Sequence, residues 1–113
     1  MSNKDYLDYV TEQLSEFGEI MIKKMFGGAG LYFDGLIFGL VTAKDVFCLK
    51  VDETNRADYE ERGMTPFGAT ETKKGMPYWE VPVEILEDRT ELAAWAMKAF
   101  EVSVKASKKK KRK

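Results

Sequence analysis

The sequence predicts an α+β fold: an antiparallel β-meander of about five strands, flanked in two layers by N-terminal, middle and C-terminal helices. Short apolar runs between positions 20 and 51 are separated by two- or three-residue turn signals, and links this short join antiparallel neighbours. Helical spacing of apolar residues precedes and follows this region. The 113 residues, 44% of them hydrophobic and 12% aromatic, suit one domain with a core.

The N-terminal helix is predicted over 2–17. Ser2 and Asp5 have the spacing of a capping box, and Gly18 is a natural C-terminal stop. Apolar residues at spacings of three and four place one stripe on this helix: Leu7, Val10, Leu14 and Phe17.

Two further helices are expected downstream. A short middle helix is predicted over 52–63, ending at Gly63. Asp88 and Glu91 form a second capping signature that opens the last helix. The apolar stripe of that helix is Leu92, Trp95, Ala99 and Val102.

The meander contains two strong hairpin signals, Gly27-Gly28 and Asp34-Gly35, because primed two-residue turns require positive φ angles. A third link at 43–45 is similarly tight. The predicted strands span 20–26, 29–33, 36–42 and 46–51. A weak strand at 70–73 is expected to pair with 78–81.

The strands predict apolar side chains on both faces of the sheet. Simple alternation puts Leu36, Phe38 and Leu40 on one face and Ile37 and Val41 on the other. In the preceding strand, Leu31 and Phe33 point to one face and Tyr32 to the other. Helices would cover one face, so an uncovered face with Tyr32, Phe38 and Leu40 is a candidate protein-interaction surface. The alternative is that the segment 64–77 folds over it.

The charge is divided unevenly along the chain. Positions 105–113 hold seven of the eighteen Lys and Arg residues and no acid, so 1–104 carries a net charge of −8. We therefore predict a domain at 1–104 and a basic, disordered tail at 105–113. The tail's candidate contacts with nucleic acid, weak and non-specific, are Lys108, Lys109, Lys110, Lys111, Arg112 and Lys113.

The composition argues against an enzyme. Histidine is absent, which removes the commonest general base and metal ligand, and Cys48 alone can form neither an intramolecular disulfide nor a zinc site. The Gly27–Gly30 loop precedes a strand, unlike a phosphate-binding loop, and matches a tight hairpin better. We expect no catalytic residue, metal or cofactor. No membrane-length apolar run or secretory signal is evident, so a cytoplasmic location is expected.

One stretch resembles a known family. Its residues are Lys24-Met25-Phe26-Gly27-Gly28-Ala29-Gly30-Leu31-Tyr32, then Asp34-Gly35, then Phe38-Gly39-Leu40-Val41. This order and spacing closely resemble the signature of the TfoX N-terminal domain. The resemblance implies an α+β domain. It also implies a link to regulators of bacterial competence, which act on transcription. The family has no established catalytic residues to transfer to this sequence. We expect a structural role for seven residues of the motif: Met25, Phe26, Gly27, Gly28, Gly30, Asp34 and Gly35.

These observations favour a non-enzymatic regulatory module that binds a protein partner and forms a homodimer through the spare sheet face. One alternative is an accessory protein that binds nucleic acid through the basic tail. Another is a small-molecule-binding domain, which would need polar groups such as Lys50, Asp52 and Tyr78 to converge on a pocket.

Overall fold

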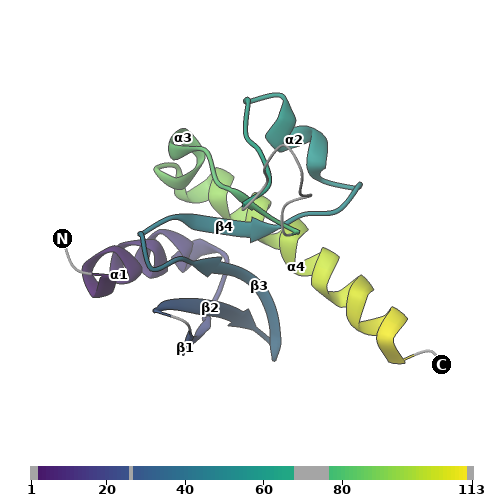
Figure 1. Cartoon of the computed structure of the whole chain (residues 1–113), viewed down its shortest axis with the longest axis horizontal. Coiled ribbons are helices and arrows are strands. Elements are labelled where there is room, and N and C mark those ends of the chain that lie inside the picture. Colours follow the sequence, from purple (N-terminus) through teal and green to yellow (C-terminus); the bar gives the residue numbers. More distant parts are fainter. Residues whose placement is uncertain (1–2, 26, 68–76, 112–113) are drawn as a thin grey trace.

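The computed structural model describes residues 3–25, 27–67 and 77–111 (Figure 1). Five antiparallel strands form one open sheet in the order β1-β2-β3-β4-β5, so each strand pairs with its neighbour in sequence. This is the predicted meander, and the predicted fold class is confirmed. The strands are β1 (Met21–Met25), β2 (Gly28–Phe33), β3 (Leu36–Val41), β4 (Phe47–Lys50) and β5 (Tyr78–Glu80).

The hairpins follow from local turn chemistry. Asp34 and Gly35 have φ angles of 51° and 81°, as the two central positions of a primed turn require. Gly27 also has positive φ, at 79°. In the β3–β4 link Asp45 has φ of 63°, and Thr42 bonds both Asp45 and Val46, which closes the three-residue loop.

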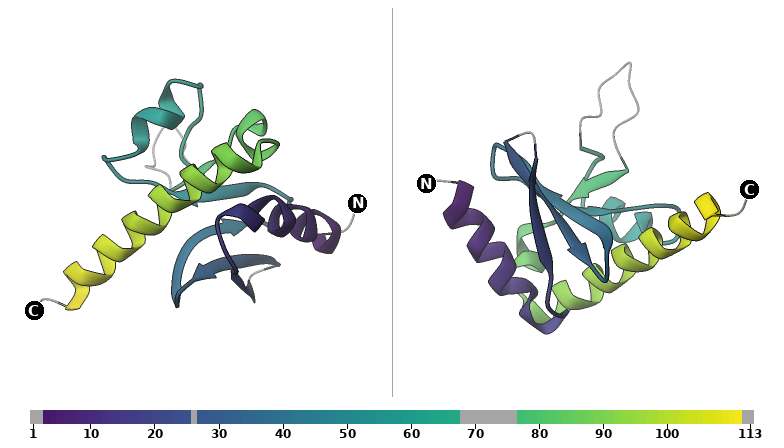
Figure 2. Two further views of the ribbon diagram at one scale, coloured as in Figure 1. Left: turned by 180° about the vertical axis from the view of Figure 1, so that it is seen from behind. Right: turned by 90° about the horizontal axis from the view of Figure 1, so that it is seen from below.

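Helices cover one face of the sheet. Seen along the sheet in Figure 2, α1 and α4 lie on the same side of the strands, while α2 and α3 lie toward the β5 end (Figure 1). The helical elements are α1 (Asn3–Gln13), η1 (Leu14–Glu16), α2 (Arg56–Glu60), α3 (Val83–Leu86) and α4 (Arg89–Lys111). The two-layer arrangement predicted from the sequence is therefore present.

Aromatic rings dominate the core between the sheet and the helices. The ring of Phe17 lies 4.7 Å from that of Phe33 and 5.0 Å from that of Phe38, measured between centroids. At the β5 end the ring of Tyr59 packs 4.7 Å from that of Trp95. Aromatic pairs of this kind add about 0.5–1.5 kcal/mol per pair to the burial of apolar area.

Three elements differ from the prediction. The middle helix is only Arg56–Glu60, because buried Asn55 accepts a bond from Asp52 N–H and donates one to the Lys50 carbonyl, which holds residues 51–55 in a turn. The four-residue α3 was not predicted. The segment 78–81 pairs with β4, and its predicted partner at 70–73 lies outside the described residues.

A β-bulge corrects the predicted assignment of faces. Leu31 pairs with Gly39 and Tyr32 with Ile37, so Phe38 is an extra residue on β3. Beyond the bulge the alternation is reversed, and Leu40 points with Tyr32 and Ile37 rather than with Phe38. Phe38 is fully buried in the core. Its assignment to an uncovered interaction face was therefore wrong, whereas Tyr32 and Leu40 are both partly exposed.

Helix α4 continues past position 105, where the sequence predicts that the basic tail begins. Its last turns extend past the sheet (Figure 1). The described part of the expected tail, residues 105–111, is helical.

Candidate protein-interaction surface

The face of the sheet opposite α1 and α4 has apolar and aromatic side chains. We call Met21, Tyr32, Ile37 and Leu40 the open face. Register places them together: Tyr32 is opposite Met21 on one side and Ile37 on the other, and Leu40 is opposite Gly30 and Cys48. Met21 is 64% exposed, and the other three are partly exposed. Helices α1 and α4 pack against the other face of these strands (Figure 2), although Ile37 also lines a cavity with Ser103 of α4.

Tyr32 is held in place by its neighbours on this face. The Lys23 ammonium lies 5.6 Å from the centre of the Tyr32 ring, a cation–π contact worth about 0.5–1 kcal/mol at an exposed site. Burial first, and then the nearby Tyr32 hydroxyl, raise the pKa of Tyr78 on β5. Tyr32 thus presents an aromatic ring with a polar tip, the type of side chain enriched in protein interfaces.

Cys48 lies in the middle of β4 and is fully buried. Burial, with a smaller contribution from Glu80 opposite it, raises the pKa of its thiol to about 12. A thiol that stays protonated at neutral pH is a poor nucleophile. Cys48 is therefore part of the packed interior of the sheet and not a reactive thiol.

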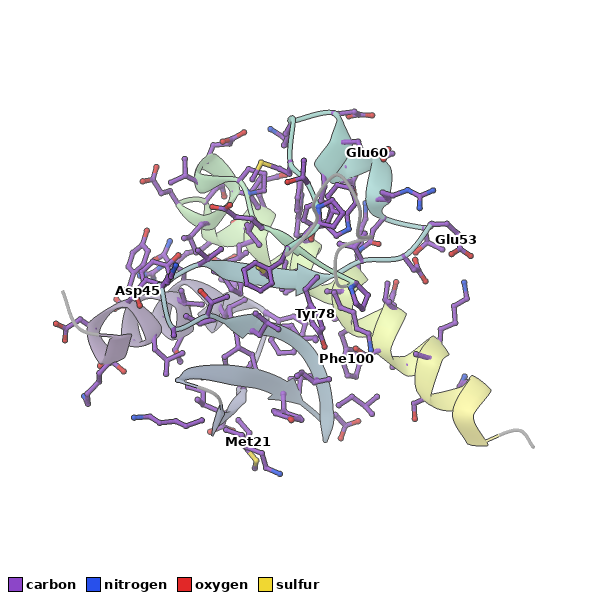
Figure 3. All side chains as sticks on the ribbon, in the orientation of Figure 1. Met21, Asp45, Glu53, Glu60, Tyr78 and Phe100 are labelled. Atoms are coloured by element: carbon purple, nitrogen blue, oxygen red, sulfur yellow. The ribbon has the colours of Figure 1, made fainter. Side chains whose placement is uncertain are left out.

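The C-terminal part of α4 is tied to the acidic segment before α2. Lys105 Nζ lies 3.7 Å from Asp52 Oδ2 and 3.6 Å from Glu53 Oε2. Burial works to raise the pKa of Asp52, but hydrogen bonds from Thr54 and the nearby Lys105 outweigh it and hold that pKa below its ordinary value. In Figure 3, Glu53 and Glu60 mark this acidic side of the molecule.

A second ion pair links α4 to α2. Lys98 Nζ lies 2.9 Å from Asp58 Oδ2. The first lysines of the basic helix thus face carboxylates of the same chain. Of the six basic residues predicted to contact nucleic acid, Lys108 is exposed. The side chains of Lys109, Lys110, Lys111, Arg112 and Lys113 lie outside the described part of the structure.

The three polar residues considered for a small-molecule site do not converge. Lys50 and Tyr78 are opposite each other in the β4–β5 pair, but Asp52 turns toward Thr54 and Lys105. An open cavity of about 260 Å³ includes Lys50 but neither Asp52 nor Tyr78. Its lining is Leu36, Ile37, Lys50, Ser103, Ala106 and Ser107.

The glycines of the motif have a backbone role. A Cβ added at Gly28 would lie 2.2 Å from the carbonyl oxygen of Val41, so only glycine fits this close approach of β2 to β3. Gly30 is buried between β1 and β3, opposite Lys23 and Leu40. Met25 ends β1, and Phe26 lies outside the described residues. The described glycines of the motif therefore belong to a tight hairpin between β1 and β2.

Within residues 3–25, 27–67 and 77–111, no group of three or more Cys, Asp or Glu side chains is placed to hold a metal ion. Over the same ranges, no helix combines the length and apolar composition needed to cross a bilayer.

The fold and the open face define a small α+β domain whose candidate site is a surface on a sheet. Comparison with protein families matches the TfoX N-terminal domain over residues 12–103. The chain therefore belongs to the TfoX N-terminal domain family, as the glycine-rich motif predicted. Comparison with curated proteins gave no match.

Proposed function

We propose that this domain is a non-enzymatic protein-interaction module that binds a partner through the open face and acts, like the regulators its family is named for, in control of competence. The observation that carries the proposal is the open face itself. It presents partly exposed Tyr32 and Leu40 beside exposed Met21, while the same sheet buries its other face against α1 and α4. Contiguous apolar surface of this kind supports binding to protein.

The charge of the domain supports a protein rather than DNA as the main partner. Residues 1–104 carry a net charge of −8, which repels a phosphate backbone. Lys98 and Lys105 on α4 are paired with carboxylates of this chain. An effect on transcription would then be exerted through a bound protein.

The test is co-purification from a nuclease-treated native lysate. Tyr32→Glu combined with Leu40→Glu places two charges on the open face and should abolish capture of a discrete partner. Tyr9→Glu is the matched control, since Tyr9 is 39% exposed and lies on α1 in the opposite layer. Thermal unfolding of all three proteins checks that each is folded. Equal capture by the double variant and the control would refute the proposal.

A second candidate function rests on the helical extension of the basic segment. Helix α4 extends past the sheet to Lys111 (Figure 1), and exposed Lys108 lies on this extension with five further basic residues following it in the sequence. Binding of nucleic acid through these basic residues would weaken steeply with salt, by about one unit of log–log slope for each phosphate neutralised. Replacing residues 108–113 with glutamine in the full-length chain would remove that salt-dependent binding.

A further inference from the structure

The two edges of the sheet are unequal. The edge at β5 is occupied, because Phe67 N–H donates to the Tyr78 carbonyl and Pro66 bridges to Trp79. The other edge is β1, which pairs with β2 alone among the described strands. An unpaired edge presents backbone donors and acceptors that an extended peptide can complete as a further strand.

Hairpin register identifies the backbone groups at this edge. The link between Met25 and Gly28 has two residues, which makes Met25–Gly28 a hydrogen-bonded closing pair. Bonded and non-bonded pairs alternate in antiparallel sheets, so Lys23 and Met21 also bond to β2. The N–H and C=O groups of Ile22 and Lys24 therefore point away from the sheet.

Lysines flank this edge on both faces. Lys24 is opposite Ala29 and points to the helix side, where it lines a cavity of about 130 Å³ together with Lys4. Lys23 points to the other side, over the Tyr32 ring. Lys4 is partly neutralised by Asp8 at 3.3 Å, and its side chain is 75% exposed. In a domain with a net charge of −8, this edge is locally basic.

The charges of Lys23 and Lys24 favour one kind of binding partner at the β1 edge. Symmetric pairing of β1 with β1 of a second copy, centred on Lys23 or Lys24, would place like charges directly opposite each other, which is unfavourable. A pairing centred on Ile22 would avoid this repulsion but would leave both lysines opposite apolar residues. An extended segment with adjacent acidic residues would instead direct successive side chains to opposite faces, one toward Lys23 and one toward Lys24. Charge complementarity thus favours an acidic peptide over a second copy of this chain.

We propose that the β1 edge binds an extended acidic segment of a partner protein by strand addition. The bound segment would hydrogen-bond to the backbone of Ile22 and Lys24 and pair its carboxylates with Lys23 and Lys24. This proposal deepens the proposed function, because it names a second contact and the chemistry of the segment that makes it, but it uses different residues from the open face.

The experiment uses the full chain and a fluorescent capped peptide, Thr-Val-Glu-Glu-Val-Thr, with binding followed by anisotropy. Two control peptides are matched to it: one with Lys in place of Glu, and one N-methylated at alternate residues so that it cannot complete the edge. We expect saturable binding of the acidic peptide, weaker binding by at least about tenfold after N-methylation, and none of the basic peptide.

Protein variants separate charge from backbone pairing. Lys23→Gln and Lys24→Gln should each weaken binding about three- to fivefold, as for an exposed ion pair. Lys24→Pro also removes the outward N–H and should weaken binding further than Lys24→Gln. Tyr32→Glu with Leu40→Glu changes the open face and leaves β1 in place, so lysate capture by these variants tests the two surfaces separately.

Amide hydrogen exchange gives the direct readout. In the free protein the amides of Ile22 and Lys24 should exchange faster than those of Lys23 and Met25, and bound peptide should slow exchange at Ile22 and Lys24. Binding unaffected by N-methylation, protection confined to α4, or no saturation at about 1 mM peptide would each overturn the proposal. One combination of results would separate the two proposals. If the wild type does not bind the peptide, but the open-face variant no longer captures the lysate partner, the edge proposal is rejected and the proposed function is retained.

Discussion

The ring of Phe38 lies 5.0 Å from the ring of Phe17, which places this strand residue inside the core beneath α1 and η1. Two residues later Leu40 is partly exposed on the opposite face. The bulge at Phe38 causes this difference, because it reverses the alternation within β3. The boundary between core and candidate interaction surface therefore passes through a single strand.

Substitution of these two residues should have unequal effects on stability. Phe38→Ala removes a fully buried ring and should lower the free energy of unfolding by about 3–5 kcal/mol. Leu40→Ala removes a partly exposed side chain and should cost about 1 kcal/mol. Urea unfolding followed by circular dichroism measures both. Similar losses in the two variants would contradict the assignment of faces.

Two glycines of the family motif should respond for different reasons. Gly28→Ala should lower the free energy of unfolding by at least about 2 kcal/mol, because the new Cβ would overlap the Val41 carbonyl. Gly35→Ala meets no atom within 4 Å and loses only the ease of adopting φ of 81°, about 1 kcal/mol. The same urea titration compares the variants. A larger loss for Gly35→Ala would be inconsistent with this hairpin geometry.

The Tyr59 hydroxyl is buried and has no hydrogen-bond partner among the described residues, although its ring packs against Trp79 and Trp95. Tyr59→Phe keeps the ring and removes the unsatisfied group. We expect the free energy of unfolding to stay constant or rise by about 1 kcal/mol. A loss of stability in thermal and urea unfolding would show that the hydroxyl has a bonding partner in solution.

The buried thiol should make stability decrease at alkaline pH. The pKa of Cys48 is about 12 in the folded protein against an ordinary value of 9.0, so between these values the unfolded chain releases the proton first. The related stabilisation is complete below pH 9 and is lost as pH rises toward 12. From pH 8 to 10 the wild type should lose about 1 kcal/mol more than Cys48→Ala.

Reactivity supplies an independent check on the same residue. Iodoacetamide at pH 8 should modify Cys48 only after the protein is unfolded in urea. Rapid modification of the native protein would place the thiol at the surface and remove the basis for the pH effect.

The sequence predicted features that depend on local chemistry. Asp34-Gly35 forms its turn where predicted, and Gly27 has the positive φ expected in the β1–β2 link, so strand order followed directly. That link is one residue earlier than predicted, at positions 26–27, because Gly28 already pairs with Met25 in the sheet. Simple alternation through Gly39 does not predict the bulge at Phe38. A glycine inside an apolar strand is itself a signal of a bulge, and here a Cβ would lie 2.7 Å from the Cys48 carbonyl oxygen.

The candidate site was predicted only in part. Tyr32 and Leu40 share a face as expected, but the inclusion of Phe38 failed because register depends on the neighbouring strands. The pairing of Lys105 with Asp52 and Glu53 could not be predicted, since it joins segments about 50 residues apart. The predicted meander already implies that its first strand is an edge, and the register of β1 against β2 is what places the backbone groups of Ile22 and Lys24 on the outer side.

The central claim is that the open face binds a protein partner, and two methionines on opposite layers allow a direct test. Met21 on the open face is 64% exposed, and Met97 on α4 is 42% exposed (Figure 3 labels Met21). Their oxidation by peroxide is measured by mass spectrometry in the free protein and in the partner complex isolated from lysate. The account predicts that the complex slows oxidation of Met21 and leaves Met97 unchanged. Slower oxidation of Met97 with Met21 unaffected would place the partner on the helical layer and contradict the claim.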